Sequence, residues 1–96
     1  LEPVAGIDHM ARERGTTKLQ DLARGPGRLA QAMQVDLRLD AVDLCSDRRL
    51  WLGDAVRPAG RIGRSVRIGL TKEAHRLLRF YERGSAFVSG PKRLRA

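Results

Sequence analysis

The run of residues from Gly25 to Met33 holds the groups in this chain that are best suited to chemistry. Gly25 can adopt backbone conformations that other residues avoid, and Pro26 suits the first turn of a helix, where a missing N–H costs nothing. Gly27 leaves the start of that helix bare, so a phosphate could reach free backbone N–H groups, with Arg28 beside it as a counter-charge. We therefore expect Gly25, Gly27 and Arg28 to contact phosphate. The simpler alternative is a buried helix that merely begins with a Gly-Pro pair.

No other group of side chains has the types and spacing of a catalytic or metal-binding site. His9 and His75 are far apart in sequence, and neither has a cysteine or acidic cluster at metal-ligand spacing. The aspartates between residues 36 and 47 lack the loop glycine and closing glutamate of an EF-hand. The serines and carboxylates form no nucleophile motif and no acid/base pair. We expect no metal, no cofactor and no catalytic residue on this chain.

The charge of the chain indicates a polyanionic partner. Its 96 residues include 19 Lys and Arg against 11 Asp and Glu, a net charge of +8. This excess is more than solubility needs in so short a chain, so nucleic acid is the first candidate partner and an anionic membrane surface the second. Cys45 is the single cysteine, which excludes an internal disulfide, and no apolar run is long enough to cross a membrane. The length fits one small domain.

Three short helices are predicted before an irregular loop. Apolar residues recur at helical spacing between glycines, and Thr17 with Gln20 has the spacing of a capping box. These signals predict helices over about 7–14, 18–23 and 26–34. Apolar and polar residues alternate over part of 35–47, but aspartates that favour turns are spread through it. We expect an extended loop with apolar anchors there.

Strands are predicted in the second half of the chain, which makes the fold class α+β. The clearest strand is 66–70, where apolar and other residues alternate. The alternation puts Arg67 on the opposite face and places Gly69 inside the strand, a position that often marks the close approach of a ligand or another backbone. Shorter strands are expected at 50–52 and 78–81.

The remaining expectations concern the ends of the strand-rich part, about 48–90. Trp51 could stack on a base, but a Trp between two leucines is more often part of a core. The basic residues 91–96 are predicted to be a solvated, frayed tail. The composition and patterns alone thus indicate a small α+β nucleic-acid-binding domain.

Three blocks of sequence together resemble the alkyladenine (3-methyladenine) DNA glycosylase family. They are 1–7 with the helix that follows, 22–33, and 67–70 followed by 78–89. Their order and spacing are similar to the C-terminal half of that family across nearly all 96 residues. The resemblance implies a monofunctional enzyme of base excision repair, which flips a damaged purine out of duplex DNA and hydrolyses its bond to the sugar with an activated water. It also implies a single mixed α/β domain, with short helices packed on a curved, mainly antiparallel sheet, and no metal.

The resemblance also assigns roles to individual residues. Arg28 matches a basic position that contacts the DNA backbone, in agreement with the phosphate contact expected there. Ile68 and Gly69 match a strand whose backbone lines the pocket for the flipped base, and Arg67 beside them is a further candidate DNA contact. The DNA contact of Arg28 and the pocket position of Ile68 and Gly69 are expectations that the resemblance implies.

Arg79 and Ser85 match a C-terminal motif to which we assign a structural role. The family's water-activating glutamate, its base-stacking tyrosines and histidine, and its wedge residue correspond to positions upstream of Leu1. We therefore expect 1–96 to be the C-terminal portion of one glycosylase domain, inactive alone. The full-length enzyme is expected to be monomeric, cytoplasmic and nucleoid-associated, with damaged double-stranded DNA as partner and no membrane. The alternatives are a non-catalytic basic nucleic-acid-binding module and a truncated product without function.

Overall fold

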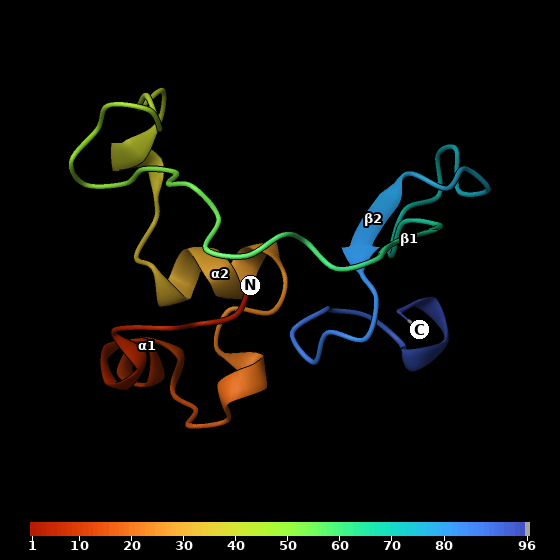
Figure 1. Ribbon diagram of the computed structural model, residues 1–96, viewed down its shortest axis with the longest axis horizontal. Coiled ribbons are helices and arrows are strands. Elements are labelled where there is room, and N and C mark those ends of the chain that lie inside the picture. The colour runs from red at the N-terminus through yellow and green to blue at the C-terminus, as the bar shows by residue number, and fades with distance from the viewer. Residues whose placement is uncertain (96) are drawn as a thin grey trace.

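The computed structural model describes residues 1–95 and confirms the α+β class. Helical elements form the first half of the chain and a two-stranded sheet lies in the second half, with a long irregular segment crossing between them (Figure 1). The helices and strands are α1 (Ile7–Arg14), α2 (Pro26–Ala32), β1 (Ile62–Ser65) and β2 (Arg79–Glu82), with 3₁₀ turns at Leu19–Asp21, Leu37–Leu39 and Lys92–Leu94.

The first two predicted helices have different outcomes. α1 has the predicted bounds, and Gly15 closes it with φ 67° while its N–H donates to the carbonyl of Ala11. The helix predicted over 18–23 is wrong in extent, because only the 3₁₀ turn Leu19–Asp21 forms and no side chain caps it. The expected capping box is therefore absent.

α2 begins at Pro26, as predicted, but ends at Ala32 rather than near 34. It packs against α1, and side-chain hydrogen bonds join the two helices. Gln31 donates from Nε2 to the carbonyl of Glu13 at 3.0 Å, and His9 Nε2 lies 3.1 Å from Gln34 Oε1. Between the helices lies a small core whose buried apolar residues are Leu22, Ala23 and Ala32. The segment that links α1 to α2 is thus held in place by the burial of Leu22 and Ala23.

The sheet is an antiparallel pair with one packed face. Gly63 lies opposite Tyr81, and Ser65 lies opposite Arg79. Gly63 and Ser65 are buried, and a Cβ at Gly63 would lie 2.5 Å from Cζ of the Tyr81 ring. Glycine at this position therefore allows the ring to lie across the strand. The other face carries Phe80, which is 61% exposed.

The strand predicted at 66–70 is wrong, because the strand lies earlier, at Ile62–Ser65. Gly69 has φ +72°, a left-handed conformation that interrupts extended backbone. Arg67 donates from Nη2 to the carbonyl of Lys72 at 3.0 Å, which closes a turn. Residues 66–70 are therefore the loop that follows β1. The strand predicted at 78–81 is confirmed by β2, which is shifted by one residue.

The strand predicted at 50–52 is also wrong. Leu52 donates its N–H to the carbonyl of Leu44 at 2.9 Å, which closes a loop and pairs with no strand. Trp51 is 64% exposed, so it does not belong to the core. An apolar triplet is too short a signal to separate a strand from a surface loop.

The prediction of a frayed tail is wrong for residues 91–95. The carbonyl of Leu94 accepts a 2.8 Å hydrogen bond from Arg79 Nη1, and Arg95 donates from Nη1 to the carbonyl of Val88 at 3.1 Å. Side-chain hydrogen bonds therefore hold the tail against the rest of the chain, and the sequence of the tail alone does not predict them. Ala96 lies outside the described residues.

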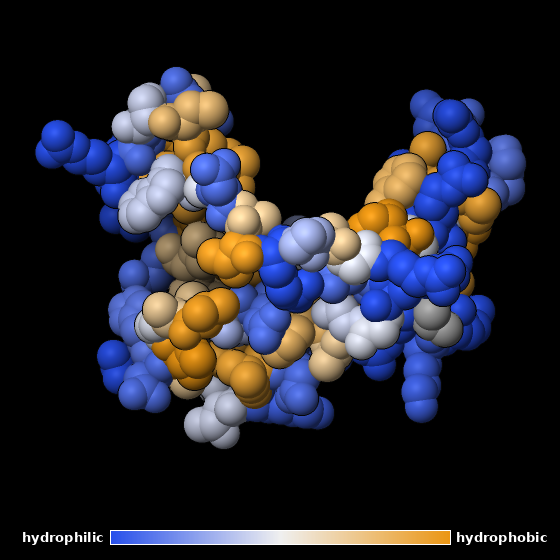
Figure 2. Space-filling view, in the orientation of Figure 1, coloured by the Kyte–Doolittle hydropathy of each residue, from blue (hydrophilic) through white to orange (hydrophobic). Residues whose placement is uncertain are grey.

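The molecule is hollowed between two arms (Figure 2). Figure 1 identifies the arm on the left as the loop around residues 36–52 and the arm on the right as the connection between β1 and β2. Orange apolar surface lies over the helical half and on the arm at the right (Figure 2). Within residues 1–95, no helix is long and apolar enough to cross a membrane.

Candidate nucleic-acid interface

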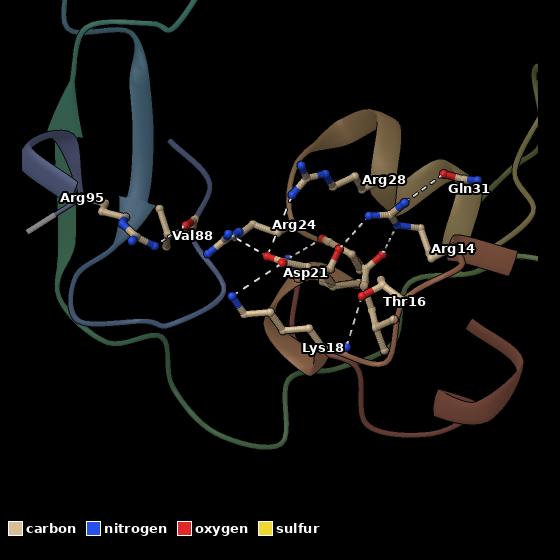
Figure 3. A network of polar contacts seen from close by, with 12 residues as sticks. Arg14, Thr16, Lys18, Asp21, Arg24, Arg28, Gln31, Val88 and Arg95 are labelled. Atoms are coloured by element: carbon tan, nitrogen blue, oxygen red, sulfur yellow. Dashed lines mark hydrogen bonds and ion pairs between the residues drawn. The ribbon is translucent and has the colours of Figure 1, made fainter. Parts of the chain in front are cut away.

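Three cations gather around the carboxylate of Asp21 in the 3₁₀ turn before α2 (Figure 3). Arg24 Nη2 lies 2.6 Å from Asp21 Oδ1, while Lys18 Nζ and Arg28 Nη1 each lie 3.9 Å from this carboxylate. One acid cannot neutralise three bases, so the cluster carries a net positive charge at the surface. We call these four residues the Asp21 cluster.

Arg14 of α1 holds the turn that carries this cluster. Its Nε donates to the carbonyl of Leu22 at 3.0 Å, and its Nη2 donates to the carbonyl of Asp21 at 3.1 Å. Its remaining amino group, Nη1, donates to Gln31 Oε1 of α2 at 3.1 Å. One guanidinium thus joins α1, the turn and α2, using the planar array of donors that only arginine has. The Asp21 cluster is therefore mounted on both helices (Figure 3).

Of the residues predicted to contact phosphate, Arg28 belongs to this cluster, and Gly25 and Gly27 precede it at the start of α2. Gly25 has φ 97° and precedes α2, while a Cβ at Gly27 would meet no atom within 4 Å. The side chain of Arg28 is half exposed. Open backbone at Gly27 and the guanidinium of Arg28 therefore share an accessible corner with Lys18 and Arg24. Contact of Gly25, Gly27 and Arg28 with phosphate stays a prediction.

Sequence reasoning missed Lys18 and Arg24 as members of this surface. The signal in the sequence was weak, because Lys18 opens the short helix predicted over 18–23 and Arg24 lies just beyond its end. Only the 3₁₀ turn brings Lys18 and Arg24 to the same carboxylate. The i, i+3 relation of each residue to Asp21 is visible in the sequence, but it does not show that Arg28 of α2 reaches the same carboxylate.

The second predicted group, Arg67, Ile68 and Gly69, lies on the loop after β1. The Nε atom of Arg67 is buried without a hydrogen-bond partner among the described residues, while its Nη2 binds the Lys72 carbonyl. Ile68 is partly exposed and lies against Gly90, where a Cβ would collide with the Ile68 Cδ1 methyl. Gly69 has open space around its Cα. The backbone at 68–69 is thus accessible, although it belongs to a loop and not to a strand.

The two predicted groups are linked by two neighbouring residues of the C-terminal segment. A Cβ at Gly25 would lie 3.8 Å from the Ser89 Cβ, and Gly90 follows directly and meets Ile68. The start of α2 and the Ile68 loop are therefore connected through Ser89 and Gly90. This arrangement is compatible with one nucleic-acid surface that uses both groups.

Arg79 has the contacts of a structural residue. Its guanidinium donates to Ser65 Oγ at 2.9 Å and to the carbonyls of Leu94 and Ser89, and its Cζ lies 4.9 Å from the Tyr81 ring centroid. It therefore joins both strands to the C-terminal segment. Ser85 acts locally, because its Oγ accepts the N–H of Phe87 at 3.2 Å.

Two aspartates of the left arm, Asp36 and Asp47, are paired with neighbouring arginines. The guanidinium and backbone N–H of Arg49 lower the pKa of Asp47 to about 2. Arg38 lowers the pKa of Asp36 in the same way, through its side chain first and its backbone second. Each of these two aspartates therefore pairs with an arginine two residues away, so Arg38 and Arg49 add no net positive charge together with their partners. Among residues 1–95, no group of three His, Cys, Asp or Glu could hold a metal.

Comparison with known proteins identifies a family. The family model described as methylpurine-DNA glycosylase matches residues 1–86. A protein of Mesorhizobium japonicum named "Putative 3-methyladenine DNA glycosylase" is 58% identical over 94 residues, covering 98% of this chain and 45% of that relative. Relatives with the same name from Paraburkholderia phytofirmans and Methanoculleus marisnigri are 48% and 40% identical, covering 98% and 93% of this chain and 44% and 48% of their own lengths. This chain thus spans about half the length of these relatives, and it belongs to the methylpurine-DNA glycosylase family.

Proposed function

We propose that this chain is the C-terminal part of a DNA-3-methyladenine glycosylase of base excision repair. Such an enzyme flips alkylated or deaminated purines out of double-stranded DNA and hydrolyses the N-glycosidic bond. Membership of the family supports the class of reaction, and the net charge of +8 supports a nucleic-acid partner. We further propose that the full-length enzyme is monomeric, cytoplasmic and associated with the nucleoid.

The single observation that carries the DNA-binding part of the proposal is the position of Arg28. It stands half exposed at the edge of the Asp21 cluster, next to the open backbone of Gly27. Arginine suits phosphate because its planar donors match phosphate oxygens. In this proposal Gly25, Gly27 and Arg28 hold the DNA backbone, and Arg67 adds a contact from the loop after β1.

The chemistry is divided between this chain and residues outside it. The backbone of Ile68 and Gly69 forms one wall of the pocket for the flipped base, while Arg79 holds the C-terminal segment and Ser85 orders the turn at Phe87. The residue that activates water is not on this chain. The 96 residues alone should therefore bind DNA without releasing a base.

Base release is tested with duplex DNA that carries hypoxanthine or 3-methyladenine. After incubation with the 96-residue chain, abasic sites are revealed by strand cleavage in alkali. We expect no release above the protein-free rate. Efficient release would contradict the proposed division, because a catalytic residue would then have to lie on this chain.

The role of Arg28 is tested with Arg28→Gln and a matched control, Arg38→Gln. Arg38 is exposed and paired with Asp36 in the left arm, so both variants remove one cation. We expect Arg28→Gln to weaken duplex binding by about 5–10-fold and to reduce the salt slope by about 1, as for the loss of one phosphate contact. Arg38→Gln should change affinity by less than about 2-fold. Equal effects of the two variants would contradict a specific role for Arg28.

The alternative function is a non-catalytic basic nucleic-acid-binding module, which the net charge also supports. It is separated from the glycosylase proposal by preference for damage. A module would bind intact duplex and duplex with a damaged purine equally. The glycosylase proposal expects tighter binding to the damaged duplex, because a damaged base is easier to unpair.

A further inference from the structure

A basic groove separates the Asp21 cluster from the C-terminal tail. Its volume is about 470 Å³, and its lining residues come from both halves of the chain: Lys18, Gln20, Arg24, Ser85, Ala86, Lys92 and Arg95. Four of the seven are cations and none is acidic. Figure 3 shows Arg24 and Lys18 reaching from one side of this groove toward Val88 and Arg95 on the other. The groove therefore lies between two cationic walls.

Each wall is fixed by contacts that leave donors free for a ligand. Arg24 is held by Asp21 at 2.6 Å, and Arg95 is held by the carbonyl of Val88 at 3.1 Å. Each guanidinium has five N–H groups, so these anchors use only part of its capacity. The side chain of Lys18 is 68% exposed. The cations are thus pre-positioned, which reduces the entropy lost when an anion binds.

The tail is held in place by a residue of the sheet. Arg79 binds the carbonyl of Leu94, so the 3₁₀ turn that carries Lys92 is tied to β2. A freely moving tail would neutralise anions anywhere on the surface, whereas a docked tail presents its charge at one place. The docking of residues 91–95 therefore turns a basic sequence into one side of a site.

We propose that this groove binds the phosphodiester backbone of duplex DNA as a contact separate from Arg28, an inference that rests on the proposed function. Its volume of about 470 Å³ leaves room for a stretch of backbone. Lysine and arginine supply the charge, and Gln20 and the Ser85 hydroxyl add neutral polar groups. A membrane surface fits less well, because an interfacial site presents large apolar side chains beside its cations and Ala86 is the only apolar residue in this lining.

The test uses the full 96-residue chain and an undamaged DNA duplex in a series of salt concentrations. Lys92→Gln removes a cation from the groove, and Arg93→Gln removes the neighbouring exposed cation, which does not line it. We expect Lys92→Gln to weaken binding by about 3–10-fold and to reduce the slope of log K against log salt by about 0.9. Arg93→Gln should have less than half of either effect, and Lys92→Arg should restore binding. Circular dichroism of each variant shows that the fold is retained.

Two results would contradict the proposal that the groove binds DNA. Equal losses for Lys92→Gln and Arg93→Gln would mean that the tail acts as diffuse charge. Tighter binding to phosphatidylglycerol vesicles than to duplex, lost in Lys92→Gln, would assign the groove to a membrane. Because the duplex is undamaged, the outcome is independent of base release. If Lys92→Gln weakens duplex binding more than Arg93→Gln but the chain shows no preference for damaged DNA, the proposed function fails while DNA binding by the groove is retained.

Discussion

At the scale of single residues, arginines connect parts of the chain that no regular element joins. Arg14 links α1, the 3₁₀ turn and α2, and Arg79 links the two strands to residues 89 and 94. Both guanidinium groups donate to backbone carbonyls in partly buried positions. With so few buried apolar residues, this chain depends on such contacts more than a large domain does.

Replacing Arg79 should detach the C-terminal segment. Arg79→Lys keeps the charge but cannot donate to Ser65, Ser89 and Leu94 together, and each hydrogen bond lost costs about 1 kcal/mol. We expect the amides of residues 92–95 to exchange with deuterium at least about 10-fold faster, since 1.4 kcal/mol is a factor of ten. Arg83→Lys, on an exposed residue after β2, is the control. Unchanged exchange in Arg79→Lys would contradict its role as an anchor.

The pair of Asp47 and Arg49 predicts a pH dependence in the left arm. The folded pKa of Asp47 is about 2, below the usual unfolded value of about 3.9. A depressed folded pKa means that the carboxylate stabilises the loop above the unfolded value and that this contribution is lost as pH falls through the folded pKa. NMR titration of the Asp47 carboxyl should therefore give a midpoint near 2 in the chain and a higher one in Arg49→Gln. A midpoint near 4 in the unmodified chain would contradict the pairing.

At this scale the sequence points to Arg28 as a candidate phosphate contact, which stays a prediction, but not to Lys18 and Arg24 beside it. Arg28 could be predicted because glycine, proline and arginine together mark the start of a helix. Lys18 and Arg24 could not, because a local pattern does not show that they share the Asp21 carboxylate with Arg28 of the next helix. Long-range contacts such as Arg79 to the Leu94 carbonyl leave no local pattern at all.

At the scale of elements, local signals predicted the helices better than the strands. Glycines bound α1 and a proline begins α2, and both signals act within a few residues. The strand register instead depends on the Tyr81 ring lying across Gly63, a contact between residues far apart in sequence. The alternation at 66–70 looked more regular than Ile62–Ser65, but Gly69 in a left-handed conformation ends extended structure there. Tertiary packing therefore overrode the pattern.

Gly90→Ala should disturb the junction between the C-terminal segment and the Ile68 loop. Gly90 has φ +97°, which strains any residue with a Cβ, and the new methyl would collide with Ile68. We expect a loss of about 1–3 kcal/mol in the free energy of unfolding, measured with urea. Gly84→Ala is the matched control, because Gly84 also has a positive φ, +77°, but no atom lies within 4 Å of its added Cβ. If both substitutions cost the same, the close approach of Gly90 to Ile68 is wrong.

At the scale of the whole molecule, few apolar side chains are buried and many are exposed. The buried apolar core of the described residues consists of Leu22, Ala23 and Ala32, whereas Trp51, Phe80 and other large apolar residues face solvent. A chain with so little burial gains little from the hydrophobic effect. The overall charge and class were predictable from composition, but this distribution was not, because it depends on where the strands and the tail lie.

The small core predicts a low free energy of unfolding and an exposed apolar surface that binds hydrophobic dyes. We expect a urea midpoint below about 3 M for the 96-residue chain and fluorescence enhancement of the dye ANS at neutral pH. Leu22→Ala should lower the midpoint further, while Leu37→Ala, at an 89% exposed residue, should leave it nearly unchanged. A sharp transition above about 5 M urea without ANS binding would contradict this description of the core.

The central claim is that the cations of the Asp21 cluster and of the docked tail bind the phosphate backbone of DNA. It is tested most directly by measuring the affinity of the chain for duplex DNA between 50 and about 200 mM NaCl. If each neutralises one phosphate, Lys18, Arg24, Arg28, Lys92 and Arg95 contribute about −4.5 to the slope of log K against log salt, and the proposed contact of Arg67 would bring the slope to about −5.4. A slope near zero would contradict the claim, because no counterions would then be released on binding.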